Sequence, residues 1–237
     1  MNSFTFGGKN TTEFHMIITD HSPAPAPKRR ITEHTIPGRS GALLTDDGGY
    51  DNVECSYSVA WWGDDSLKLP DLSLQIRNWL VGKPGYQILY DTYEPDYFRM
   101  AYVSNQIDIS EMMMQIGKAD IKFSCKPFRY SWEGQQIFTL TQPGKIYNPE
   151  FCQAEPYLKI YGSGDITLNI ENKGWIFKDI TDFIEVDSEM MNAYKETLPM
   201  NDRMQGEGFP ILNPGWNELS WEGNLQKIEW KPRWKSL

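Results

Sequence analysis

Two sets of residues have types and spacings that could support catalysis. Asp46 with Asp47, and Asp64 with Asp65, are carboxylate pairs of the kind that glycosidases use, but tandem Asp side chains usually point apart rather than across a sugar. The three histidines could bind a metal or transfer a proton, yet none has another ligand type three or four residues further on; they are His15, His21 and His34. Neither set predicts a catalytic or metal site.

The motifs of nucleotide-binding and hydrolytic enzymes are missing from the chain. No Gly-x-Gly-x-x-Gly, Gly-x-Ser-x-Gly or Walker loop occurs, and the Gly-Ser-Gly at residues 162–164 precedes neither Lys-Ser/Thr nor a helical pattern. Cys55, Cys125 and Cys152 are odd in number and lack CxxC spacing, so we expect reduced thiols, two of them inside strands. We therefore expect no enzymatic activity, no cofactor and no metal.

Four tryptophans near the end of the sequence could form a binding platform. They lie among cations, as in surfaces that stack on sugars or single-stranded nucleic acid: Trp216, Trp221, Trp230 and Trp234 with Lys227, Lys231 and Arg233. Ile228 and Trp230, however, alternate with Lys227 and Glu229 as the inner and outer faces of a strand do. Core packing is the favoured interpretation, and a module that binds host cell-wall glycans is the alternative function.

Charge and hydropathy exclude several classes of protein. The 23 basic and 32 acidic residues give a net charge of −9, which disfavours a phosphate-backbone binder and an anionic-membrane binder. No apolar run approaches the roughly 20 residues of a membrane span, and no signal peptide is recognisable, so we expect a soluble protein made in the cytoplasm. The 11 Phe, 12 Tyr and 9 Trp favour β-sheets over helical bundles.

The first half of the sequence predicts several strands and one helix. Residues 54–61 alternate with the period of a half-buried strand, and residues 108–116 and 120–128 indicate a strand pair joined across residues 117–119. Between them, apolar residues recur at helical spacing after Pro70 and Asp71 and before Gly82; they are Leu69, Leu72, Ile76, Trp79 and Leu80.

A proline-rich segment interrupts the early strands. Pro23, Pro25 and Pro27 cannot donate to a β-ladder and favour an extended chain, so residues 20–30 should form an exposed loop or arm. The segment ends in Lys28, Arg29 and Arg30. A connector loop is the plainer interpretation and an arm that grips a partner the functional one.

Turn signals then divide the second half into short strands. They fall at residues 143–144, 148–149, 162–165, 172–174 and 213–215, a spacing typical of a β-sandwich, and separate runs such as 157–161 and 165–170. We predict two domains, 1–138 and 139–237.

Six segments, in order along the chain, resemble one family. Residues 36–41 (IPGRSG), followed by GYDN at 49–52, resemble the distal tail (Dit) proteins of siphophages. The resemblance continues at residues 123–130 (FSCKPFRY), 155–165, 184–188 and 209–217, and so covers essentially the whole chain.

The resemblance implies a mainly β fold: an N-terminal β-sandwich with one α-helix and an extended arm, and a C-terminal galectin-like β-sandwich. It also implies a structural hub in the virion's tail tip, a generally hexameric ring through which DNA passes. Its expected partners are other copies of itself, the tail tube protein, a tail-associated lysin or fibre protein and a receptor-binding protein. The His-x-Asn-Pro-Arg type motif of galectins is absent, so sugar binding does not carry over.

We assign the expected contacts between subunits to the arm and the motif that follows it. The basic end of the arm could relieve the repulsion between subunits of charge −9, and Pro37 with two glycines could reverse the chain tightly. The candidate interface residues are Lys28, Arg29, Arg30, Pro37, Gly38, Arg39, Ser40 and Gly41.

Overall fold

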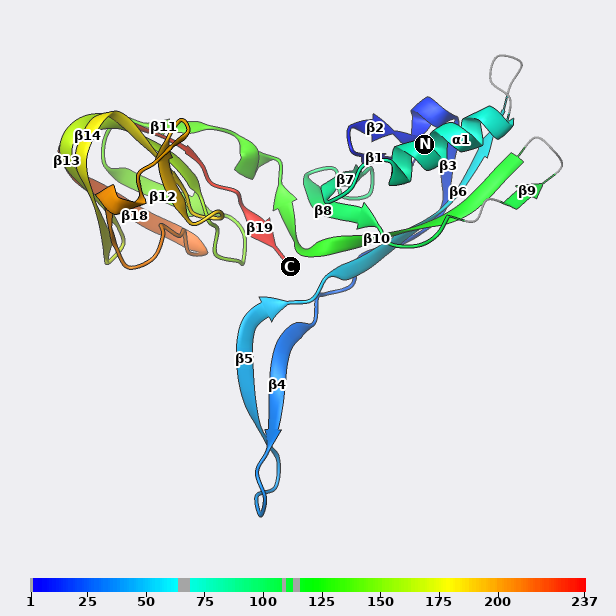
Figure 1. The fold of residues 1–237 in the computed structure, drawn as a ribbon, viewed down its shortest axis with the longest axis horizontal. Helices are drawn as coiled ribbons and strands as arrows, with labels where there is room; N and C mark the ends of the chain where they lie inside the picture. Colours follow the sequence, from blue (N-terminus) through cyan, green and yellow to red (C-terminus); the bar gives the residue numbers. More distant parts are fainter. Residues whose placement is uncertain (1, 64–68, 108–109, 113–115) are drawn as a thin grey trace. The chain divides into compact units, whose positions relative to one another are not determined.

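The computed structural model describes residues 2–63, 69–107, 110–112 and 116–237, which form two compact units (Figure 1). The first unit runs to Arg129 and includes Leu237, and the second spans Tyr130 to Ser236. Each unit has a hydrophobic core of its own. We placed the domain boundary after Phe138 from the sequence, and the independent folding of two domains stays a prediction.

The first unit is built on a curved antiparallel sheet with strand order β2-β1-β7-β8-β10-β6-β3, and β9 pairs with β10. Its strands are β1 (Phe4–Phe6), β2 (Lys9–Asn10), β3 (Met16–Ser22), β6 (Val53–Trp62), β7 (Gln87–Asp91), β8 (Tyr97–Val103), β9 (Ser110–Met112) and β10 (Ile116–Ser131). The 3-10 helix η1 (Thr11–Phe14) joins β2 to β3. The predicted alternation of β6 is confirmed, because Cys55, Tyr57, Val59 and Trp61 are all buried.

Helix α1 (Leu69–Val81) covers this core, as the helical spacing predicted. Leu69, Leu72, Ile76 and Leu80 are buried on its inner face. Two hydrogen bonds from tryptophans connect the helix to the sheet. Trp61 Nε1 of β6 donates to Ser73 Oγ of the helix at 3.3 Å, and Trp79 Nε1 of the helix donates to the Phe6 carbonyl of β1 at 2.8 Å. It is the one α-helix in the described part of the chain.

The expected turn at residues 117–119 is wrong. These residues lie inside β10, where Gly117 pairs with Trp61 and Ala119 with Val59 of β6. A Cβ on Gly117 would lie 2.4 Å from the Trp61 ring, so this glycine makes room for an indole rather than for a turn. Residues 108–109 and 113–115 of the predicted strand pair lie outside the described residues.

A separate two-stranded sheet interrupts the first unit between β3 and β6. It consists of β4 (Arg29–Thr35) and β5 (Ala42–Tyr50), paired antiparallel. Every residue of β4 is exposed, and so are the first seven of β5. We call this hairpin, residues 29–50, the arm.

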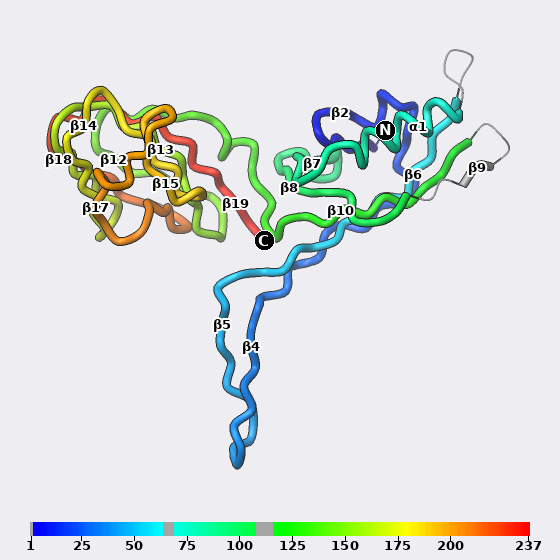
Figure 2. The backbone as a smooth tube through the Cα atoms, in the orientation of Figure 1, coloured from blue at the N-terminus to red at the C-terminus, as the bar shows by residue number. Residues whose placement is uncertain are grey.

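The second unit is an eight-stranded sheet that curls around its core (Figure 2). The strand order is β11-β18-β13-β14-β15-β16, with β12 on β18 and β17 on β14. The elements are η2 (Glu133–Gln135), β11 (Phe138–Leu140), β12 (Gly144–Asn148), β13 (Tyr157–Ile170), β14 (Lys173–Asp187), β15 (Asn192–Lys195), β16 (Leu198–Pro199), η3 (Asn201–Arg203), β17 (Met204–Gly206) and β18 (Gly215–Lys231). The last strand, β19 (Lys235–Ser236), is not part of this eight-stranded sheet. The mainly β fold class is thereby confirmed, while a specifically galectin-like sandwich stays a prediction.

One predicted turn of this unit is a bulge within a strand. Residues 157–161 and 165–170 belong to the single strand β13, whose register shifts between Gly164 and Ile166. Gly162 is required there because a Cβ would lie 2.3 Å from the Asn224 carbonyl oxygen of β18. Residues before and after the bulge, such as Ile160 and Leu168, enter the same core.

Buried side chains settle two smaller expectations. Cys55 and Cys125 are free, buried thiols on β6 and β10, and Cys152 is a free thiol outside the strands. Ile228 and Trp230 are buried, with Trp234 beside them in the core, which confirms the core-packing interpretation for this end of β18.

Candidate interface on the hairpin arm

The structure places all eight candidate interface residues on or next to the arm. Lys28 precedes β4, and Arg29 and Arg30 are its first two residues. Residues 37–41 form the loop at the opposite end, where β4 turns into β5. The candidates therefore occupy the base and the tip of one hairpin.

The tip is a glycine-dependent reversal, as the sequence predicted. Gly38 and Gly41 have φ values of +79° and +85°, a region that residues with a Cβ rarely adopt. Between them, the Arg39 backbone N–H donates to the Ile36 carbonyl at 3.2 Å. The loop is thus a defined turn that presents Arg39 and Ser40 as exposed side chains.

The middle of the arm exposes aliphatic side chains on both faces. The register pairs Glu33 with Leu44 and His34 with Leu43, so the two leucines lie on opposite faces of the ribbon. Leu43 is 50% exposed, Leu44 58% and Ile31 45%. A two-stranded ribbon without a buried face adds nothing to the core of its own chain. Its exposed aliphatic side chains could instead be buried against another protein molecule.

An ion pair between Arg29 and Asp46 links β4 and β5 at the base of the arm. Arg29 Nε donates to Asp46 Oδ2 at 2.8 Å, Nη2 donates to the same oxygen, and Nη1 donates to the Tyr50 hydroxyl at 3.2 Å. The guanidinium also lies 5.4 Å from the centre of the Tyr50 ring. The hydrogen bonds from Arg29 lower the pKa of the Asp46 carboxyl, and Asp46 in turn raises the pKa of Arg29.

A bulge in β5 brings these residues together. Arg29 pairs with Tyr50 but Ile31 pairs with Asp46, so β5 contains extra residues at this point. Gly48 has φ +76° there, and its N–H donates to Asp46 Oδ1 at 2.9 Å. Arg30 Nε lies 3.9 Å from Asp51 Oδ1. Each arginine thus has a carboxylate near it on the returning segment of the hairpin, an arrangement that only the strand register reveals.

The proline-rich segment is a loop, the plainer of the two predicted forms, and we call residues 23–28 the neck of the arm. The ends of the predicted segment, residues 20–22 and 29–30, belong to β3 and β4. Pro23 and Pro25 lie outside any strand and are exposed, as predicted. Ala24, in contrast, packs against the core of the first unit. The segment could not be distinguished from the arm by sequence because β4 and β5 lack the alternation that marks a half-buried strand.

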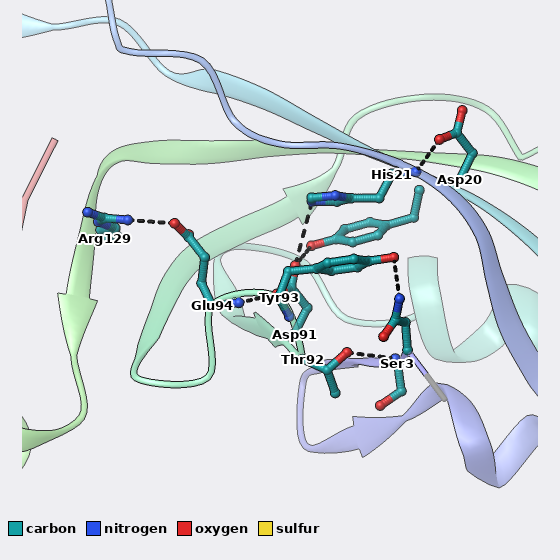
Figure 3. A network of polar contacts seen from close by, with 10 residues as sticks. Ser3, Asp20, His21, Asp91, Thr92, Tyr93, Glu94 and Arg129 are labelled. Carbon is teal, nitrogen blue, oxygen red and sulfur yellow. Dashed lines mark hydrogen bonds and ion pairs between the residues drawn. The ribbon is translucent and has the colours of Figure 1, made fainter.

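The chain is anchored where the neck begins, through His21 at the end of β3 (Figure 3). The His21 ring stacks on Tyr93, with 4.2 Å between ring centres and 6° between planes, and lies 5.3 Å from the Tyr57 ring. His21 Nε2 is 3.9 Å from Asp91 Oδ2, which also accepts a hydrogen bond from the Tyr57 hydroxyl at 2.5 Å. Sequence reasoning treated His21 only as a doubtful metal ligand and did not single out Asp91.

The loop that holds His21 is itself fixed by hydrogen bonds (Figure 3). Asp91 Oδ1 accepts the backbone N–H groups of Tyr93 at 2.9 Å and Glu94 at 3.0 Å. Glu94 forms a 2.5 Å ion pair with Arg129. A cavity of about 210 Å³ opens beside the neck, and its lining includes Ala24. Aromatic and polar contacts therefore hold the chain to the core of the first unit at the point where the neck begins.

The carboxylates and histidines that could support catalysis are described only in part. Asp46 is bound to Arg29, and Asp47 lies 3.5 Å from the Thr32 hydroxyl. Asp64 and Asp65 fall outside the described residues. Among the residues that the structure does describe, no three His, Cys, Asp or Glu side chains are grouped to hold a metal, and no helix is long and apolar enough to cross a membrane.

Comparison with known proteins identifies the fold. No family model matches the chain, and neither does any curated protein. Among solved structures, the chain is similar to the Dit (gp 19.1) protein of phage SPP1, described as a paradigm of the hub adsorption apparatus in phages that infect Gram-positive bacteria. The TM-score is 0.73 over 100% of both chains, at 13% sequence identity. This chain therefore has a Dit-like fold.

Proposed function

We propose that the protein is the distal tail hub of a siphophage, located at the tip of the tail in the virion. Six copies form a ring whose lumen lets DNA pass, and the ring joins the tail tube protein to a tail-associated lysin or fibre protein, with a receptor-binding protein as a further partner. The protein acts as a connector without enzymatic activity.

The observation that carries this proposal is the structural likeness over the whole length of both chains. A match that includes both units and the arm is more specific than a match to one β-sandwich, because β-sandwiches occur in many unrelated proteins. Function does not follow from fold by itself, so the proposal depends on a surface suited to assembly. The arm supplies that surface.

In the proposed ring, the arm of one subunit packs on the first unit of its neighbour. Ile31, Leu43 and Leu44 then become buried, and Arg39 at the tip provides a positive charge toward a neighbour of net charge −9. Lys28 and Arg39 have no ion-pair partner in the described part of the chain, unlike Arg29 and Arg30. Accordingly, Lys28, Arg39 and the aliphatic side chains make the contact. Arg29, Arg30 and the two glycines of the 37–41 loop shape the hairpin.

The experiment is a comparison of oligomer size for two matched double variants. Leu43→Asp with Leu44→Asp changes the arm, and Leu74→Asp with Val81→Asp changes two similarly exposed aliphatic residues of α1. We expect sedimentation velocity to show monomers for the arm variant and full-size rings for the helix variant, with unchanged circular dichroism in both. Rings that persist in the arm variant at low micromolar concentration would show that the arm does not form the contact between subunits.

A further inference from the structure

One face of the second unit's sheet combines exposed aromatic rings with polar groups. We call it the outer face; it crosses strands β12, β18, β13, β14 and β17 and consists of Tyr147, Lys145, Trp216, Glu218, Ser220, Glu222, Asn169, Thr167, Gly174, Ile176 and Gln205. None of these residues belongs to the interface proposed for the arm.

Strand register and burial fix which side chains lie on this face. Along β18, Asn217 and Leu219 are buried, so Trp216, Glu218 and Ser220 point to the opposite side and are exposed. Ser220 pairs with Asn169 of β13, which pairs with Gly174 of β14. The next row along the strands joins Glu222, Thr167, Ile176 and Gln205 in the same way.

An aromatic pair marks one end of the outer face. Tyr147 and Trp216 are directly paired across β12 and β18, with 5.1 Å between ring centres and 55° between planes. Tyr147 is 52% exposed and Trp216 is 67% exposed, although large aromatic side chains gain most from burial. Such a pair provides ring surface for a ligand rather than for the core.

Groups that can form hydrogen bonds continue from the aromatic pair. The side chains of Ser220, Asn169, Thr167, Glu222 and Gln205 make no hydrogen bond within the described part of the chain. Gly174 adds no side chain beside the Asn169 amide, so the middle of the face is open to a ligand. Hydroxyl, amide and carboxylate groups are thus present together on one regular surface.

We propose that the outer face binds a neutral glycan. The C–H side of a sugar ring carries partial positive charge and stacks on the negative face of an aromatic ring, while the sugar hydroxyls form hydrogen bonds with amide, hydroxyl and carboxylate groups. Glu218 and Glu222 outnumber Lys145, which lies 3.9 Å from Glu218, so an anionic polysaccharide is repelled. This inference goes beyond the hub role and does not depend on it.

The assignment differs from the four-tryptophan platform that the sequence suggested. Trp230 is 6% exposed and Trp234 3% exposed, and Trp221 packs partly against the core. Of the four, Trp216 alone is largely exposed, and it pairs with Tyr147, which lies 69 residues earlier in the chain. Only the strand pairing shows this combination.

The test uses the full-length protein on a printed array of neutral glucose, galactose and N-acetylglucosamine oligosaccharides, with sulfated oligosaccharides alongside. Trp216→Ala with Tyr147→Ala removes the stacking surface, and Ser220→Tyr obstructs the middle of the face with a residue that strands accept. Leu198→Ala, at an equally exposed residue of β16, is the control.

We expect the wild type and Leu198→Ala to retain at least one class of neutral oligosaccharide, and both outer-face changes to weaken retention at least tenfold with melting temperature and oligomer size unchanged. No retention by the wild type, retention of sulfated sugars only, or retention that survives both changes would overturn the proposal. Because oligomer size is measured on the same samples, failure here is distinct from failure of the hub proposal.

Discussion

Two arginine–aspartate pairs, one on the arm and one in the second unit, have the same chemistry in opposite surroundings. Arg29 and Asp46 have side chains that are 50% and 43% exposed, whereas those of Arg233 and Asp187 are 18% and 5% exposed. Water screens an exposed pair, but a buried one is costly to break because it leaves a charge without a partner. We therefore expect the stability of the second unit to depend on its ion pair, whereas the exposed pair only shapes the arm.

The buried pair lies at the point where both ends of the second unit meet. Arg233 donates to both Asp187 oxygens, at 2.6 and 2.8 Å, from a residue with φ +57°. The Arg233 backbone N–H donates to the Gly134 carbonyl at 2.7 Å, and the Ser131 N–H donates to the Trp234 carbonyl at 3.0 Å. These bonds connect the first and last segments of the unit to β14.

The largest expected effect comes from Arg233→Met. It leaves Asp187 buried beside a neutral side chain, so we expect a loss of about 3–5 kcal/mol in the free energy of unfolding of the second unit. Urea denaturation followed by circular dichroism measures it, with Lys178→Met as the control because Lys178 is exposed. A loss no larger than that of the control would contradict the role assigned to the pair.

Low pH should lower the stability of the second unit. Burial raises the pKa of Asp187, but hydrogen bonds from Arg233 and the Met190 N–H outweigh it, and the net pKa lies below the ordinary value. A carboxyl with a depressed folded-state pKa adds stability above about pH 4, near the unfolded-state value, and that stability is lost as the pH falls further. The wild-type melting temperature should therefore drop below pH 4. In Arg233→Met, the decrease of the melting temperature below pH 4 should be smaller or reversed. An equal decrease in the variant and the wild type would show that Asp187 is not its cause.

Gly38→Val should affect the arm alone. A Cβ at φ +79° costs about 1–2 kcal/mol, which favours local opening of the hairpin but leaves both cores intact. We expect hydrogen exchange of the amides of β4 and β5 to accelerate by roughly 5–30-fold. Ser40→Val, in the same loop but without a positive φ, should leave exchange unchanged. Equal acceleration of hydrogen exchange in both variants would mean that the loop does not accept a large side chain at either position, whatever its φ.

The smallest effect is expected for Arg29→Met. The Arg29–Asp46 pair is exposed and belongs to no core, so the melting temperature of the monomeric chain should stay within the error of the measurement. Differential scanning calorimetry at a protein concentration at which sedimentation velocity shows monomers provides the comparison with Arg233→Met. A decrease similar to that of Arg233→Met would show that the arm unfolds together with a core.

Elements with one buried face could be predicted from the sequence, and elements without one could not. The alternation of Cys55, Tyr57 and Val59 and the spacing of Leu72 and Ile76 identify β6 and α1, because burial imposes those periods. The arm has no buried face, so its strands show no alternation of apolar and polar residues. From the sequence, only the neighbouring prolines indicate an exposed segment there. The tip was predictable only because its glycines need positive φ.

Glycines inside strands and contacts between distant residues were beyond sequence reasoning. Gly117 and Gly162 resemble turn residues until the Trp61 ring and the Asn224 carbonyl beside them are seen. The pairing of Tyr147 with Trp216 likewise follows from strand register and not from spacing along the chain. The candidate interface residues lie on or next to one hairpin, and their role as an interface stays a prediction. The carboxylate neighbours of Arg29 and Arg30, Asp46 and Asp51, become visible only when the register of the hairpin is known.

The most direct test of the central claim is the native mass of the full-length chain in solution. If the protein is a tail hub that closes through its arms, native mass spectrometry at low micromolar concentration should give a dominant species of six times the 27.4 kDa chain. The Leu43→Asp with Leu44→Asp variant should give the single-chain mass under the same conditions. A wild-type protein that remains at 27.4 kDa across a hundredfold range of concentration would contradict the ring.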